Sequence, residues 1–181
     1  VVAVATSAVR DATNRDEFLD RVKREAGVEI KILTGDEEAR RTLLGIRSGL
    51  PADVTDLLAL DIGGGSTEFI LSRPGLSPVV RSIDIGVVRL SERILHHDPP
   101  TGEEICQARE WVARETKSAV AVIGNSQPAT FVGTAGTITS LAAMAQKLPS
   151  YEPARIQNYQ LQLTTIQELE RAFQEALEMD A

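Results

Sequence analysis

The run from Asp61 to Glu68 holds the residue types that phosphate chemistry requires, at a spacing that a single turn can bring together. Its sequence, Asp-Ile-Gly-Gly-Gly-Ser-Thr-Glu, follows an apolar segment that is typical of a buried strand. Three consecutive glycines remove every Cβ from the turn, so backbone N–H groups can approach a phosphate oxygen closely, and two hydroxyls follow them. The run therefore predicts a phosphate cradle made of Gly63, Gly64, Gly65, Ser66 and Thr67.

Two carboxylates frame this turn. With the turn centred near Gly64 and Gly65, Asp61 and Glu68 face each other across a hairpin, with Cβ atoms roughly 4.5–5.5 Å apart. Such carboxylates repel, so one is protonated or a cation lies between them. Mg²⁺ suits the site because it binds one or two carboxylates together with waters and phosphate oxygens. The competing interpretation is a glycine turn with two solvated acids at its rim. No Gly-Lys-Ser/Thr follows, so the run is not a Walker P-loop.

A second acidic cluster lies at the start of a predicted helix. Thr34 and Glu37 have the spacing of a capping box, and acids in a first helical turn favour the positive end of the helix dipole. These effects explain Asp36 and Glu37. Glu38 is not needed for capping, so it is a candidate for chemistry, although spacing alone fits a surface acid equally well.

Two further segments could bind an anion. Arg10 follows a predicted strand and could hold a phosphate in bidentate geometry, yet an arginine at that place is more often a surface residue. The segment Gly133–Thr139 is rich in glycine and threonine and enters a predicted helix, which suits an anion at the helix N-terminus. Close packing between strand and helix would explain its glycines nearly as well.

The composition excludes several classes of protein. The chain has 181 residues, of which 43% are hydrophobic, and a formal net charge of -7. That charge argues against binding nucleic acid, which needs a basic surface. One cysteine, Cys106, allows neither an intrachain disulfide nor a cysteine-rich zinc site. No apolar run reaches the roughly 18 residues of a membrane span, and the start lacks the basic region of a signal peptide. We therefore expect no membrane association and a cytoplasmic location.

The elements that must position these residues alternate along the chain. Strands are predicted over 1–9, 28–33, 57–62, 67–71, 79–85, 129–132 and 159–163, and helices over 14–26, 34–48, 101–124, after 137, and from 165 to the chain end. This alternation indicates a mixed α/β fold. A Gly-Leu-Pro stop at 49–51 predicts a boundary between a domain of residues 1–52 and one of residues 53–181. The first holds only the alternating tail of the pattern seen in the second.

Four stretches, in their order and spacing, resemble the exopolyphosphatase/guanosine pentaphosphate phosphohydrolase family. They are Ala5–Ala12, Thr34–Arg40, Asp61–Glu68 and Gly133–Thr139. The family lies in the actin-like ATPase superfamily, so the resemblance implies two ribonuclease H-like domains with mixed sheets and a site in the cleft between them. It also implies that residues 1–52 are the C-terminal part of the first domain, whose opening hairpin is absent. The second domain would lack its final strand and helix, so the chain is expected to be incomplete at both ends.

The resemblance also implies a role for each candidate residue. Glu38 would be the general base that activates water, while Asp61 and Glu68 would hold Mg²⁺. The glycine turn would cradle the terminal phosphate, and Arg10 would hold the phosphate chain. A second phosphate loop would contain Gly133, Gly136 and Thr137. The implied activity is Mg²⁺-dependent release of terminal phosphate from inorganic polyphosphate or guanosine pentaphosphate, and the implied assembly includes a homodimer as one option.

Two other functions stay open from the sequence. The missing first phosphate loop would fit a non-catalytic module that binds polyphosphate or guanosine polyphosphates without turnover. An ATP-dependent sugar kinase of the same superfamily would instead consume ATP faster when a sugar is added. The pair Glu37-Glu38 counts against the kinase, because that pattern is not shared by kinases of the superfamily.

Overall fold

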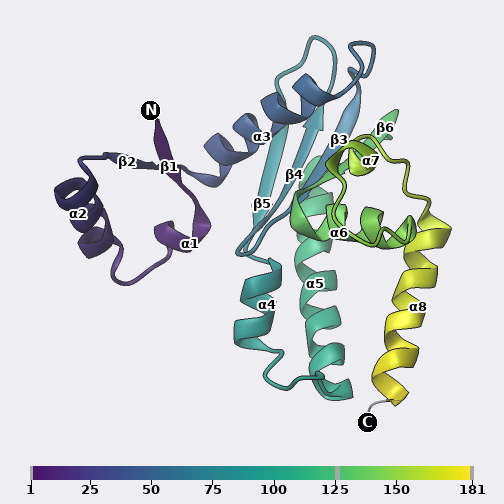
Figure 1. Cartoon of the computed structure of the whole chain (residues 1–181). Helices are drawn as coiled ribbons and strands as arrows, with labels where there is room; N and C mark the ends of the chain where they lie inside the picture. Colours follow the sequence, from purple (N-terminus) through teal and green to yellow (C-terminus); the bar gives the residue numbers. More distant parts are fainter. Residues whose placement is uncertain (1, 125–126, 180–181) are drawn as a thin grey trace.

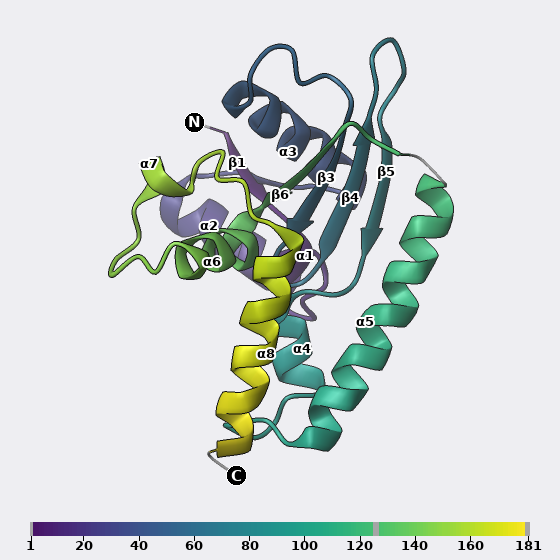
Figure 2. The same ribbon diagram turned by 90° about the vertical axis from the view of Figure 1, so that its right-hand side faces the viewer.

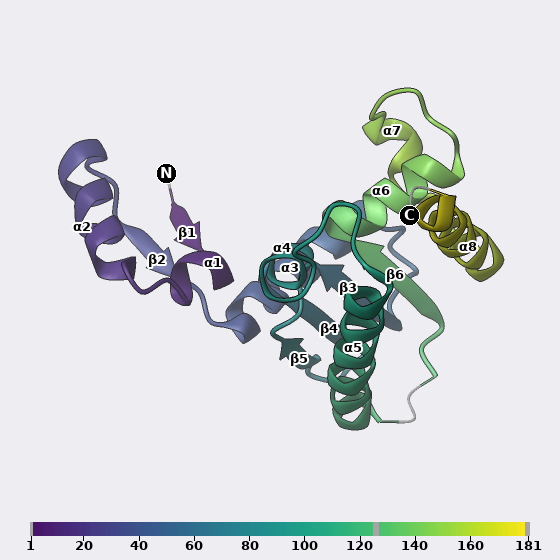
Figure 3. The ribbon, with the colours of Figure 1, turned by 90° about the horizontal axis from the view of Figure 1, so that it is seen from below.

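The computed structural model describes residues 2–124 and 127–179. A small unit at the N-terminal end contains the parallel strands β1 (Ala3–Ala5) and β2 (Ile30–Ile32), with α1 (Ser7–Arg10) and α2 (Arg15–Ala26) between them. Figure 1 shows this unit apart from a larger sheet, and Figure 3 shows helix α3 (Gly35–Gly49) leading from one to the other. The predicted domain boundary at 52 and 53 falls in the loop after α3 and stays a prediction.

The strand predicted over 1–9 is wrong beyond Ala5. The chain turns at Thr6 and forms the single helical turn α1, in which the amides of Arg10 and Asp11 donate to the carbonyls of Thr6 and Ser7 at 2.9 Å. Only β2 pairs with β1, so a longer strand would have no partner there among the described residues. Local hydrogen bonding therefore outweighs the β propensity of the valines. Val1 lies outside the described residues.

The larger sheet has four strands in the order β5-β4-β3-β6. Strands β3 (Leu57–Ile62), β4 (Thr67–Ser72) and β5 (Val79–Ile83) are antiparallel neighbours, and β6 (Thr130–Thr134) runs parallel to β3. The mixed sheet matches the expected fold class, although β5 ends two residues earlier than predicted and β6 runs two residues further. Every residue of β4 is buried, because helices cover both faces of the sheet.

The faces of the sheet follow the two-residue alternation of a strand. On β4, Ile70 packs with Ala39 and Leu43 of α3, whereas Phe69 and Leu71 pack with α5 (Gly102–Ile123) on the opposite face. Figure 2 shows α3 and α5 on opposite sides of the strands. Both helices begin with the capping boxes that the sequence predicted, Thr34 with Glu37 and Thr101 with Glu104.

Four more helices complete the described part of the larger unit. They are α4 (Val87–Arg93), α6 (Ala135–Ala145), α7 (Pro153–Ile156) and α8 (Leu163–Met179). The predicted strand over 159–163 is wrong. Its segment has no strand neighbour among the described residues, and Asn158, in the left-handed conformation with φ 57°, donates through its side chain to the carbonyl of Gly49. Helix α8 starts two residues before the predicted position, and 180–181 lie outside the described residues. No described helix is long and apolar enough to span a membrane.

Gly86 sits where the backbone of the glycine turn leaves no room for a side chain. A Cβ at this position would lie 2.3 Å from the carbonyl oxygen of Gly64 and 2.6 Å from the nitrogen of Gly65. Gly86→Ala in the full-length protein should therefore lower the free energy of unfolding by about 1–3 kcal/mol, measured by urea denaturation. Gly102→Ala is the matched control, because a Cβ there meets no atom within 4 Å. Equal stability of the two variants would contradict the close approach.

Candidate active site

Asp61 and Glu68 are directly opposite each other in the β3–β4 pair, as the sequence predicted. Asp61 follows Leu57 and Ala59 at intervals of two, and both of these pack on the α3 face of the sheet. Glu68 precedes Ile70, which packs on that same face. The register and the alternation therefore turn both carboxylates toward helix α3.

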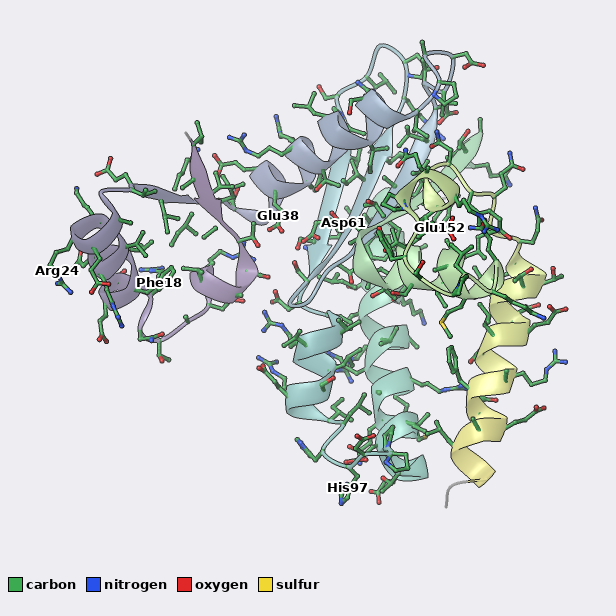
Figure 4. The ribbon with its side chains drawn as sticks, in the orientation of Figure 1. Phe18, Arg24, Glu38, Asp61, His97 and Glu152 are labelled. Atoms are coloured by element: carbon green, nitrogen blue, oxygen red, sulfur yellow. The ribbon has the colours of Figure 1, made fainter. Side chains whose placement is uncertain are left out.

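Helix α3 brings a third carboxylate to this face. Ala39 and Leu43 are buried against the sheet, so their preceding neighbours Glu38 and Thr42 lie one turn apart beside the strand ends. The hydroxyl of Thr42 donates to Asp61 Oδ2 at 3.0 Å. Figure 4 labels Glu38 and Asp61 where α3 approaches β3. Three acids from three elements thus meet at one end of the sheet.

Glu38 is a carboxylate in a poor environment for its charge. Its side chain is 19% exposed, and its Oε2 is buried with no hydrogen-bond partner in the described part of the chain. Burial raises the pKa of Glu38, and the charge of Asp61 adds to that effect, while Arg10 and the Thr6 hydroxyl oppose it. A carboxylate that is held ionised against such a shift is a stronger base than a solvated one.

Glu68 is buried more deeply, at 2% exposure. The hydroxyl of Ser82 on β5, the register partner of Glu68, donates to its Oε1 at 2.8 Å. Burial raises the pKa of Glu68, the hydroxyls of Ser82 and Ser66 counter it, and the charges of Glu38 and Asp61 raise it further. Neighbouring buried carboxylates of this kind share a proton or a cation.

Arg10 reaches this cluster from α1. Its Nη1 donates to the carbonyl of Leu33 at 3.0 Å and lies 3.8 Å from Glu38 Oε2. Its Nε lies 3.6 Å from Asp11 Oδ1, and the side chain is 25% exposed. The structure thus places Arg10 beside the carboxylates, although its helical setting differs from the predicted strand end.

The glycine turn between β3 and β4 has its carbonyls occupied and its amides free. The carbonyl of Gly63 accepts from the amide of Val87 at 3.1 Å, and that of Gly64 accepts from the amides of Val88 and Arg89 at 2.9 and 3.1 Å. Across the part of the chain that the structure describes, three consecutive turn amides donate no hydrogen bond, namely those of Gly64, Gly65 and Ser66. Such a row of unpaired donors is suited to bind an anion.

The two hydroxyls of the predicted cradle are both buried. Ser66 is 3% exposed, and Thr67 is 5% exposed. The Thr67 hydroxyl donates to the carbonyl of Ile85 at 2.7 Å, so it ties the turn to the segment before α4. The two glycines before them, Gly64 and Gly65, are the more exposed residues of this turn.

The segment Gly133–Thr139 forms no loop, because β6 ends at Thr134 and α6 begins at Ala135. Gly133 lies within β6, and a Cβ there would lie 2.7 Å from Cγ2 of Ile138, so close packing accounts for this glycine. Ala135 has φ 68°, a left-handed conformation that is uncommon outside glycine and often marks functional sites.

Gly136 and Thr137 lie across a cavity from the glycine turn. The cavity has a volume of about 460 Å³, and its lining includes Gly63, Gly64, Gly136 and Thr137. A larger groove of about 700 Å³ runs along α5 and contains none of the candidate residues. The small cavity therefore joins the two segments that the sequence singled out as anion sites, while Gly133 lies outside its lining.

The site offers a pair of carboxylates, which fits a magnesium ion but not a metal that needs three or more protein ligands. No cluster of three or more His, Cys, Asp or Glu side chains with metal-binding geometry occurs among the described residues. Mg²⁺ does not need such a cluster, because it keeps several waters and uses one or two carboxylates plus substrate phosphates. Asp61 and Glu68 form such a pair, and the buried charges of the site favour a cation between them.

Three residues at this site were given no role from the sequence. They are Thr42, Ser82 and Arg89, which bind Asp61, Glu68 and Gly65, respectively. Thr42 lies one turn after Glu38, so helical spacing could have indicated it. Ser82 becomes apparent only with the β4–β5 register. Nothing in the sequence indicates that Arg89 contacts the turn.

Comparisons with known proteins agree on one family. The model described as the Ppx/GppA phosphatase family matches residues 1–181. Exopolyphosphatase 2 of Mycobacterium tuberculosis is 40% identical over an alignment of 160 residues, and the match covers 84% of this chain and 49% of that protein. The Ppx/GppA family member of Aquifex aeolicus superposes with a TM-score of 0.77 at 35% identity, covering 97% of this chain and 55% of that one.

A second solved structure supports the same fold. An exopolyphosphatase from Cytophaga hutchinsonii superposes with a TM-score of 0.81 at 28% identity, covering 95% of this chain and 56% of that one. These matches confirm the predicted mixed α/β fold of the actin-like type. The chain spans about half the length of the relatives that it matches.

Proposed function

Because this chain belongs to the Ppx/GppA phosphatase family, we propose that the full-length protein is a Mg²⁺-dependent phosphohydrolase. Its substrate is inorganic polyphosphate, guanosine pentaphosphate, or both, and its product is the terminal phosphate. One observation carries the proposal: Glu38, Asp61 and Glu68 converge beside a turn with three unpaired amides. Anion donors and buried bases at one place are what hydrolysis of a phosphoanhydride requires.

The free amides of the turn hold the terminal phosphate in this proposal. Gly64, Gly65 and Ser66 supply N–H donors that cost no reorganisation, because their peptide units are already fixed by helix α4. Arg10 binds the phosphate chain from the opposite side with the donors of its guanidinium that Leu33 does not use. The negative charge of the whole chain makes these local donors necessary.

Glu38 is the general base. A water molecule between Glu38 and the terminal phosphorus gives its proton to the carboxylate while its oxygen forms the new P–O bond. The bond from that phosphorus to the bridging oxygen breaks, and the shortened phosphate chain leaves with the electron pair. The raised pKa of Glu38 suits this transfer, since proton affinity increases with pKa.

Asp61 and Glu68 hold Mg²⁺ in this proposal, with Thr42 and Ser82 orienting the two carboxylates through their hydroxyls. The bound ion supplies neutralisation of the charge on the phosphate oxygens. Without a cation, the same carboxylates would repel a polyanion approaching the turn.

The direct test is phosphate release by the full-length protein from long-chain polyphosphate and, separately, from guanosine pentaphosphate. We expect release from at least one substrate with Mg²⁺ and loss of release in excess EDTA. Tight binding of both substrates without release would contradict the hydrolase and favour the binding module. ATP consumption that rises on addition of a sugar would instead favour a kinase.

A further inference from the structure

We infer that Arg89 is a positioning residue that connects the glycine turn to helix α1. In this arrangement Arg10 and the free turn amides can bind the same phosphate. This inference rests on the proposed function and goes beyond it, because Arg89 would not touch the substrate. Arg89 lies on α4, and its side chain is 14% exposed.

Arg89 joins two parts of the chain that are far apart in sequence. Its Nε donates to the carbonyl of Gly65 at 2.7 Å, and its Nη2 donates to Asp11 Oδ2 at 2.7 Å. Asp11 is the residue that ends α1, directly after Arg10. A planar guanidinium can make both bonds at once in a fixed geometry. One side chain therefore sets the distance between the turn and the arginine that faces Glu38.

The contact with Gly65 also fixes an amide. In a trans peptide the carbonyl and the N–H point in opposite directions, so the carbonyl of Gly65 determines where the amide of Ser66 points. The same reasoning links the carbonyls of Gly63 and Gly64 to the amides that follow them. The amides of α4 hold those two carbonyls, and Arg89 holds the third. Helix α4 and Arg89 together thus orient all three free donors.

Helix α1 touches the turn directly as well. Ser7 is 5% exposed, and a Cβ added to Gly65 would lie 2.6 Å from its hydroxyl oxygen. This contact leaves no space for movement of α1 toward the turn, while the Arg89–Asp11 pair resists movement away from it. The two bonds to Gly65 and Asp11 tie the Arg89 side chain to both the turn and helix α1, which is the arrangement of a positioning residue.

The test uses the full-length protein and two measurements, the affinity for tripolyphosphate by calorimetry and the kinetics of phosphate release. We expect Arg89→Ala to weaken binding and raise KM by roughly tenfold, the effect of losing charge-assisted hydrogen bonds. Arg89→Lys should recover little, because an ammonium cannot reproduce the two bonds. Arg93→Ala is the matched control on the same helix, since Arg93 lies over the ring of Trp111 and should leave KM within about twofold.

A combination with Arg10→Ala separates positioning from general stability. If Arg89 acts through Arg10, the Arg10→Ala substitution should cost much less in the Arg89→Ala background than in the wild type. Independent, multiplying effects, or an Arg89→Ala protein that binds as tightly as Arg93→Ala, would overturn the inference. A wild-type protein that binds tripolyphosphate but releases no phosphate would refute the hydrolase alone, because the binding comparison still decides the role of Arg89. Absence of both binding and release would refute both.

Discussion

Glu38→Gln in the full-length protein should lower kcat for phosphate release by about 10²–10⁴-fold, the usual contribution of a general base, while KM changes little. Glutamine keeps the size of the side chain and one acceptor oxygen, but it cannot accept the proton of the attacking water. The binding donors, Arg10 and the turn amides, are untouched. Steady-state kinetics on polyphosphate and on guanosine pentaphosphate would measure both parameters.

The same substitution should raise stability while it lowers kcat. A raised pKa means that folded Glu38 binds a proton more readily than unfolded Glu38, so its contribution is favourable at low pH and is lost as the pH rises through the folded pKa. Above that pKa, the ionised carboxylate opposes folding. We therefore expect Glu38→Gln to have a higher Tm than the wild type at pH 8 without Mg²⁺.

Glu37, the preceding residue, provides the matched control. Lys31, together with the backbone and hydroxyl of Thr34, lowers the pKa of Glu37 to about 2. Its contribution is therefore present above the unfolded pKa and is lost only as the pH falls toward about 2. Glu37→Gln should lower the Tm at pH 8 and leave kcat unchanged. A Glu38→Gln protein with normal kcat would show that another group accepts the proton.

Local spacing was enough to predict where several of the candidate residues lie. Period-two alternation and a centred turn put Asp61 opposite Glu68, and the register agrees. The capping box of Thr34 with Glu37 places the start of α3, and that start determines the face on which Glu38 lies. Each of these relations depends on residues a few positions apart, for which local geometry leaves few choices.

The predictions that failed depended on partners elsewhere in the chain. The apolar alternation at 159–163 is that of a strand, yet no strand of the described sheets lies beside it. The valines before Arg10 favour a strand, yet the pairing with β2 ends at Ala5. Arg89 is 78 positions from Asp11, so their contact depends on how α4 and α1 meet at the turn. Propensity carries no information on such contacts.

Glu68→Gln in the full-length protein should remove the response to Mg²⁺ and lower kcat at least about a hundredfold, because charge neutralisation by a metal contributes several kcal/mol to such a reaction. Without Mg²⁺ the variant should melt at a higher temperature than the wild type. Burial and the nearby charges of Glu38 and Asp61 raise the pKa of Glu68, so its ionised form opposes folding at neutral pH.

Added Mg²⁺ should reverse that order of stability. The ion binds the folded carboxylates and not the unfolded chain, so it raises the Tm of the wild type by mass action and leaves Glu68→Gln unchanged. Calorimetric titration with Mg²⁺ alone measures the same loss of binding without turnover. Because the metal needs ionised carboxylates and the pKa of Glu68 is raised, the affinity for Mg²⁺ should fall as the pH is lowered toward that pKa.

Glu110→Gln, on an exposed position of α5, is the matched control and should respond to Mg²⁺ as the wild type does. Equal Mg²⁺ responses of Glu68→Gln and Glu110→Gln would show that Glu68 does not bind the metal. Glu68 would then act only as the hydrogen-bonded partner of Ser82.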